Sequence, residues 1–171
     1  MNRLVALFAL AALTIVPAVA RSSSTSIAAV GVGAHGYDWL IGTWACKNSM
    51  PSPMGGPAAT TLTVSRSTNG SLAIHVSGTN FDGVGYVTYS PKTKTWWNPS
   101  ALATGDTSSE SSQQTGKKTV WTGPFYEAAT GKSMPIRDTY TLVNATTYHD
   151  LSEAQIGGVW KTIGNITCTK S

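Results

Sequence analysis

Charged residues are scarce in this sequence, and they are never gathered in one place. Only 12% of the 171 residues are Asp, Glu, Lys or Arg, about half of the fraction that is usual in soluble domains. The net charge is +4, but no basic run is longer than the pair Lys117-Lys118. Nucleic-acid-binding proteins usually cluster their Lys and Arg, so this pattern argues against a nucleic-acid partner.

Cysteine is equally scarce. The chain has two, Cys46 and Cys168, and neither has a second cysteine or a histidine at the short spacings of zinc ligands. We therefore expect no metal site. In an exported chain two cysteines are usually bonded to each other, and we predict a disulfide between Cys46 and Cys168.

Long hydrophobic runs are absent. The longest, residues 4–16, is shorter than the roughly 20 residues that a membrane-spanning helix needs. It follows the basic Arg3 and precedes an Ala-Val-Ala triplet that ends at Ala20, which is the pattern of a secretory signal peptide and its cleavage site. We predict a signal peptide over residues 1–20, export to the periplasm or the outside of the cell, and no membrane span.

The composition of the chain after the predicted cleavage site changes at about residue 37. Residues 21–36 are rich in Ser, Ala and Gly, which predicts a disordered leader. From residue 37 onward, aromatic and β-branched residues recur to the end of the chain. About 135 residues are enough for one domain with its own core, so we predict a single domain over residues 37–171.

Sustained 3.6-residue periodicity is missing from this domain, which argues against a helical fold. Short segments rich in Thr, Val, Tyr and Trp alternate instead with turn sequences such as Asn69-Gly70. This pattern indicates an all-β fold, an up-and-down antiparallel β-barrel of about eight to ten strands, with a two-sheet sandwich as the main alternative. The predicted strands cover residues 40–47, 58–66, 71–78, 82–90, 95–103, 107–114, 118–125, 134–143, 146–154 and 159–170.

Pairing the two cysteines sets the register between the first and the last strand. In an antiparallel pair with Cys46 opposite Cys168, Trp44 lies opposite Lys170. A cation beside an indole face contributes roughly 0.5–2 kcal/mol, depending on burial. Joining the first strand to the last also removes both free edges of the sheet. We therefore predict that this pairing closes the barrel.

These same residues carry a resemblance to a known superfamily. A Gly-x-Trp triplet on the first strand, with a basic residue of the last strand over the Trp, is similar to the signature of the lipocalins and fatty-acid-binding proteins, the calycins. The matching residues are Gly42, Trp44 and Lys170, although calycins usually have Arg in place of the Lys. Residues 37–44 also resemble small bacterial lipocalin-like domains of unknown function and the nitrobindin-like haem barrels.

The resemblance implies a barrel that binds a small hydrophobic or amphipathic molecule in its interior. We expect the protein to be a monomer. Alternation places Ile136, Tyr140 and Leu142 on the inner face, together with Asp138. A carboxylate on an apolar face needs a partner or a proton, so Asp138 either lies in a wet barrel mouth or orients a ligand. Alternation on the last strand puts Trp160 on the face of Cys168. The candidate ligand-binding residues are Trp44, Tyr86, Trp96, Trp121, Asp138, Tyr140, Leu142 and Trp160.

Other functions are weighed against binding. The sequence has no GxSxG, HExxH or P-loop motif, and we assign no catalytic residue. An isomerase-like or cyclase-like enzyme would need a second titratable group beside Asp138 and Tyr140. The nitrobindin resemblance implies haem ligation by His149, but the flanking residues do not match, so we expect no cofactor. A filled barrel with a structural or interaction role is the last alternative.

Overall fold

The chain folds into a closed β-barrel in which every strand runs antiparallel to its neighbours. The computed structural model describes residues 35–52 and 56–171, so the predicted signal peptide (1–20) and nearly all of the predicted leader (21–36) lie outside the described residues. The elements are a 3-10 helix, η2 (Asp38–Leu40), followed by β1 (Gly42–Asn48), β2 (Ala59–Arg66), β3 (Leu72–Gly78), β4 (Phe81–Ser90), β5 (Thr95–Leu102), β6 (Thr107–Ser112), β7 (Lys118–Glu127), β8 (Lys132–Asn144), β9 (Thr147–Ile156) and β10 (Val159–Lys170).

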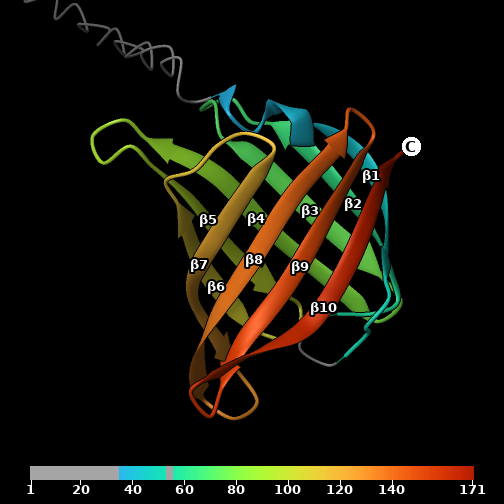
Figure 1. Ribbon diagram of the computed structural model, residues 1–171, viewed down its shortest axis with the longest axis vertical. Coiled ribbons are helices and arrows are strands. Elements are labelled where there is room, and N and C mark those ends of the chain that lie inside the picture. The colour runs from blue at the N-terminus through green and yellow to red at the C-terminus, as the bar shows by residue number, and fades with distance from the viewer. Residues whose placement is uncertain (1–34, 53–55) are drawn as a thin grey trace, which may run out of the picture.

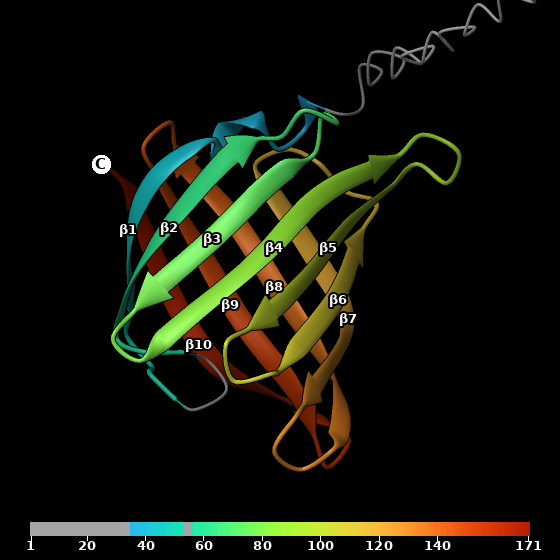
Figure 2. The same cartoon turned by 180° about the vertical axis from the view of Figure 1, so that it is seen from behind.

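The strand order around the barrel is the order of the sequence, and β1 closes the circle by pairing with β10. Strands β8, β9 and β10 form the near wall in Figure 1, and β2, β3 and β4 form the near wall in the opposite view of Figure 2. The ten predicted strands are all present, with ends that differ by no more than two residues. The predicted barrel is therefore confirmed, and the sandwich alternative is wrong.

The register between the first and last strands is also confirmed. Cys46 lies opposite Cys168 and Trp44 lies opposite Lys170. The two cysteines form a disulfide, and the Lys170 Nζ lies 5.0 Å from the centre of the Trp44 ring. Trp44 is fully buried, so the cation contacts an indole that is shielded from solvent.

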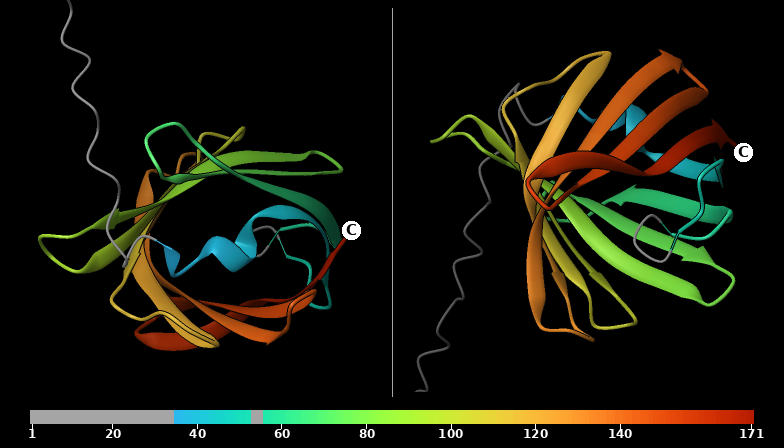
Figure 3. Two further views of the ribbon diagram at one scale, coloured as in Figure 1. Left: turned by 90° about the horizontal axis from the view of Figure 1, so that it is seen from above. Right: turned by 60° about the horizontal axis from the view of Figure 1, so that its bottom comes forward.

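Aromatic side chains fill the end of the barrel at which β1 begins. Helix η2 lies across this end, as the view from above in Figure 3 shows. Tyr37 packs edge-on to Trp96 with ring centres 4.8 Å apart, and its ring centre lies 5.0 Å from that of Trp121. Trp44 donates a hydrogen bond of 2.7 Å from Nε1 to the Leu40 carbonyl. We call this end of the barrel, formed by η2 and the buried rings of Tyr37, Trp44, Trp96, Trp121 and Tyr148, the aromatic plug.

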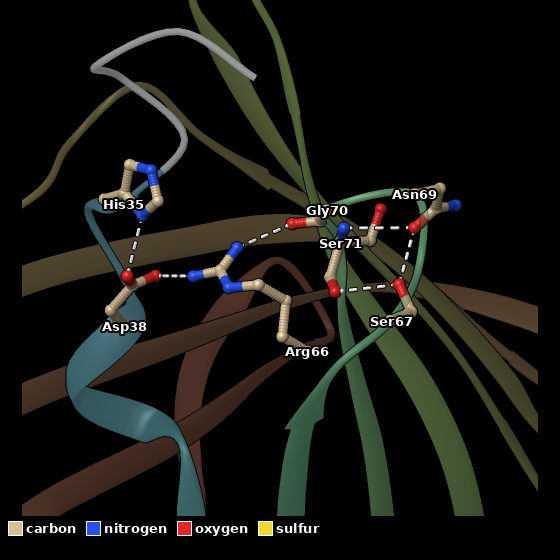
Figure 4. Close-up of polar contacts among 7 residues, drawn as sticks. All are labelled: His35, Asp38, Arg66, Ser67, Asn69, Gly70 and Ser71. Atoms are coloured by element: carbon tan, nitrogen blue, oxygen red, sulfur yellow. Dashed lines mark hydrogen bonds and ion pairs between the residues drawn. The ribbon is translucent and has the colours of Figure 1, made fainter. Parts of the chain in front are cut away.

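A polar contact ties η2 to the hairpin between β2 and β3. Asp38 of η2 forms an ion pair with Arg66, the last residue of β2, and its other oxygen contacts His35. Arg66 also donates a hydrogen bond of 2.8 Å to the Gly70 carbonyl in the hairpin turn, as Figure 4 shows. The turn is held internally by Ser67 and Asn69. These contacts fix the plug to the rim of the barrel.

We predict that the disulfide makes a large contribution to stability. It joins residues that are 122 positions apart, and a chain-entropy model gives about 4 kcal/mol or more for such a loop. The Cys46→Ala/Cys168→Ala variant should lose about 3–5 kcal/mol of unfolding free energy in urea titrations. Adding a reductant should destabilise the wild type and leave the double variant unchanged. Equal sensitivity of both to the reductant would contradict the prediction.

Gly42 provides a second test of the closure. Its φ is +133°, and a Cβ there would lie 2.6 Å from the Lys170 Cε. We expect Gly42→Ala to lower the unfolding free energy by about 1–3 kcal/mol through backbone strain, and by more through displacement of Lys170. Gly116→Ala is the matched control, because Gly116 has a φ of +117° and no atom within 4 Å of such a Cβ. An equal loss in both variants would show that Lys170 is not displaced.

Candidate functional site

The barrel interior contains a cavity of about 260 Å³. Its lining runs from Leu40 under the plug to Asn48, Phe81 and Leu102 at the other end of the barrel. These last three residues end β1, begin β4 and end β5, which places them at the end away from η2. The volume is close to the lower end of the roughly 300–1,000 Å³ that is typical of ligand pockets, so the cavity suits a small molecule.

One wall of the cavity is apolar. Leu62 and Val64 of β2 and Ile74 and Val76 of β3 all line it. Each pair is separated by one residue, so both members point to the same side of their strand. Leu62, Val64, Ile74 and Val76 therefore all point into the barrel.

The opposite wall carries three carboxyl groups. In a ring of ten strands β3 lies across from β8, and β4 from β9. Asp138 comes from β8, Asp150 from β9, and Glu110 from β6, which is separated from β8 by β7. All three line the cavity, and the exposed fraction of Glu110 is only 2%. The cavity thus has an apolar wall that faces an acidic one.

Strand geometry explains how the three acids meet. Asp138 lies opposite Ser152 on β9, and the next inward residue of β8, Tyr140, lies opposite Asp150. Glu110 reaches toward β8 across β7, and the backbones of β6 and β7 approach each other closely at Gly123. A Cβ at Gly123 would lie 2.0 Å from the Ser109 carbonyl oxygen and 2.7 Å from the Glu110 Cα. A larger residue at this point of β7 would therefore displace the β6 backbone that carries Glu110.

Burial dominates the electrostatics of these acids. Desolvation raises the pKa of Glu110 well above its ordinary value, and the charges of Asp138 and Asp150 raise it further. The pKa of Asp150 is raised in the same way, first by burial and then by Asp138. Burial also raises the pKa of Asp138, but hydrogen bonds from Ser152 and Glu110 oppose the shift. All three carboxyl groups therefore release their protons at a higher pH than exposed carboxyl groups do.

Two tyrosines border the acids and add hydroxyl groups without adding charge. Tyr140 and Tyr148 both line the cavity, and their ring centres are 5.8 Å apart. Burial and then the neighbouring Asp150 raise the pKa of both phenols, so they stay neutral.

The eight predicted ligand-binding residues fall into three groups. Asp138 and Tyr140 line the cavity as expected. Trp44, Trp96, Trp121 and Leu142 instead belong to the aromatic plug or pack against it. Tyr86 and Trp160 lie outside the cavity lining altogether.

The positions of Tyr86 and Trp160 have clear physical reasons. Tyr86 follows the inward Gly85 on β4, so alternation turns it outward, where it is 51% exposed. On β10 a bulge between Thr162 and Gly164 breaks the alternation. Trp160 therefore does not share the face of Cys168, contrary to the sequence-based expectation. It packs under Arg137, whose guanidinium carbon lies 4.5 Å from the ring centre.

Two functional candidates were missed from the sequence, Glu110 and Asp150. Glu110 lies in the polar stretch Thr107–Ser112, where no hydrophobic alternation reveals which side faces inward. Asp150 follows His149, and only the pairing of Tyr140 with Asp150 identifies which of the two points inward. His149 is exposed and hydrogen-bonds Thr167 at 3.0 Å, so it contributes nothing to the cavity.

Other features of the described chain limit the chemistry. Within residues 35–52 and 56–171, no group of three His, Cys, Asp or Glu side chains has a geometry suited to a metal ion. Among the same residues, no helix is long and apolar enough to cross a membrane. The disulfide is typical of oxidising compartments outside the cytoplasm.

A scan against protein-family models gives no match, and no curated protein matches the chain significantly. Of what the calycin resemblance implied, the structure shows the closed antiparallel barrel.

The buried acids should make the protein less stable as the pH rises. In the unfolded chain they ionise near pH 4, whereas the folded protein keeps their protons to higher pH. The folded state then binds more protons, so its unfolding free energy falls with rising pH, by about 1.4 kcal/mol per pH unit for each extra proton. Urea titrations between pH 5 and pH 8 should show this decline.

Glu110→Gln should reduce the decline, since it removes one of the coupled protons. Glu127→Gln is the matched control, because Glu127 lies at the end of β7 beside the turn and its carboxylate accepts a hydrogen bond from the Thr130 hydroxyl. An identical pH dependence in the wild type and in Glu110→Gln would contradict the assignment of Glu110 as a protonated interior acid.

Proposed function

We propose that this protein is an exported barrel that binds a small amphipathic molecule in its cavity. The observation that carries the proposal is the division of the cavity into an apolar wall and an acidic wall. A ligand with an apolar body and one polar group fits both walls when it spans the barrel from β3 to β8. Export is supported by the signal-peptide pattern of residues 1–20 and by the disulfide.

The aromatic plug supports binding at the other end. Helix η2 and its buried rings close the barrel on one side, so a ligand reaches the cavity from the end lined by Phe81 and Leu102. Cavities that enclose most of a ligand and place a few polar groups are the usual form of small-molecule sites. The candidate residues in contact with the ligand are Asp138 and Tyr140, joined now by Glu110 and Asp150.

Acid–base catalysis on the same scaffold is the second candidate. The sequence alone suggested that a second titratable group beside Asp138 and Tyr140 would favour it, and Glu110 and Asp150 supply that group. A carboxyl with a raised pKa is suited to general acid or base work near neutral pH. If the barrel is an enzyme of this kind, a bound carbon acid should exchange its labile hydrogen with deuterium in heavy water.

Filling the cavity should abolish binding. We expect Leu62→Trp, which adds bulk to the apolar wall, to weaken binding of 1-hexanol at least tenfold, as measured by calorimetry. Thr63→Trp is the matched control, because Thr63 is the next residue on β2 and is exposed.

Native mass spectrometry of the protein from its own host should reveal a retained small molecule. The proposal is wrong if wild-type protein binds neither 1-hexanol nor its amine analogue 1-hexylamine.

A further inference from the structure

We propose that the polar group of the ligand is a protonated amine, held between Glu110, Asp138 and Asp150. This inference rests on the proposed function and names the chemical class of the ligand. It starts from the three acids of the cavity wall, which come from β6, β8 and β9.

Two oxygen atoms in this group lack any partner in the described chain. The Oε1 of Glu110 and the Oδ1 of Asp150 are fully buried and accept no hydrogen bond. Both side chains line the cavity. Buried carboxyl oxygens normally have a donor, and an unmet one is destabilising. These two oxygens therefore mark where a donor from outside the chain would sit.

The missing donor is a cation for two reasons. Among the described residues that line the cavity there is no Lys, Arg or His, so no side chain neutralises the acids when they ionise. An alkylammonium has three N–H donors and no acceptor, which matches a set of carboxyl groups. A ligand carboxylate would instead face like charges in a desolvated site.

An organic amine fits better than a metal ion. The acids and other possible ligands in the described chain do not form a group with metal-binding geometry. An amine also brings an apolar body, for which Leu62, Ile74 and Val76 on the opposite wall provide a surface. The limited volume of about 260 Å³ favours a short primary amine over a lipid-sized one.

Binding of the amine should release protons. In the empty cavity the acids keep their protons because they are desolvated, and an ammonium beside them favours the ionised forms. The groups that face the site are Glu110 of β6, Asp138 and Tyr140 of β8, and Tyr148 and Asp150 of β9. The two phenols stay neutral throughout, so the carboxyl groups are the source of the protons.

The test uses three probes of one chain length: 1-hexylamine, 1-hexanol and hexanoate, each titrated into the full protein by calorimetry at pH 7. The amine should bind at least tenfold more tightly than the alcohol, and hexanoate should not bind. Repeating the amine titration in buffers with different ionisation enthalpies should reveal proton release. Because protons are released, the amine should also bind more tightly at pH 7 than at pH 5.

The variants Asp150→Asn and Glu110→Gln should weaken binding of the amine at least tenfold more than they weaken binding of 1-hexanol. Glu127→Gln, outside the cavity, should change neither. If the alcohol binds as tightly as the amine, the amine inference is overturned and the proposed ligand-binding function stands. If none of the probes binds, both are overturned. Circular dichroism of each variant confirms that a loss of binding is not a loss of folding.

Discussion

The pairing of β1 with β10 is the interaction on which the rest of the barrel depends. Without it both strands would be open edges with unpaired backbone groups, and the cavity would lose a wall. The disulfide joins this pair, and the Lys170 ammonium covers Trp44 in the same pair. Trp44 also donates a hydrogen bond to the carbonyl of Leu40. The pairing that closes the barrel wall therefore also fixes the position of the aromatic plug.

The plug and the cavity have opposite energetic roles. The buried rings remove a large apolar surface from water, which is the main source of stability in a domain of this size. The three buried acids work against it, since each must stay protonated or find a cation. A fold selected for stability alone would place apolar side chains there. Groups that break the rules of a core, held in place by an otherwise consistent structure, are characteristic of functional sites.

The sequence was sufficient to predict the structure wherever its pattern allowed only one arrangement of the strands. Two cysteines on the outermost strands set one register, and that register placed Trp44 opposite Lys170. Alternation with apolar neighbours placed Asp138 and Tyr140 inside. The sequence was insufficient where a strand has only polar residues, as at Glu110, because no alternation then shows which side chains point inward. It was also insufficient at the β10 bulge, which changes the side of the strand on which Trp160 lies. Both depend on contacts between strands that no local pattern contains.

The sequence of β4 explains part of the space in the cavity. The inward positions of this strand include Gly83 and Gly85, which are both buried and line the cavity. Because β4 lies across the ring from β9, these two positions face the strand that carries Asp150 and have no side chain with which to fill the space. Close packing against β5 also favours glycine here, because a Cβ would lie 2.6 Å from a Leu102 side-chain carbon at Gly83 and 3.1 Å from the Pro99 carbonyl oxygen at Gly85. The two glycines leave space in front of the acids, and this space is where the proposed ligand would bind.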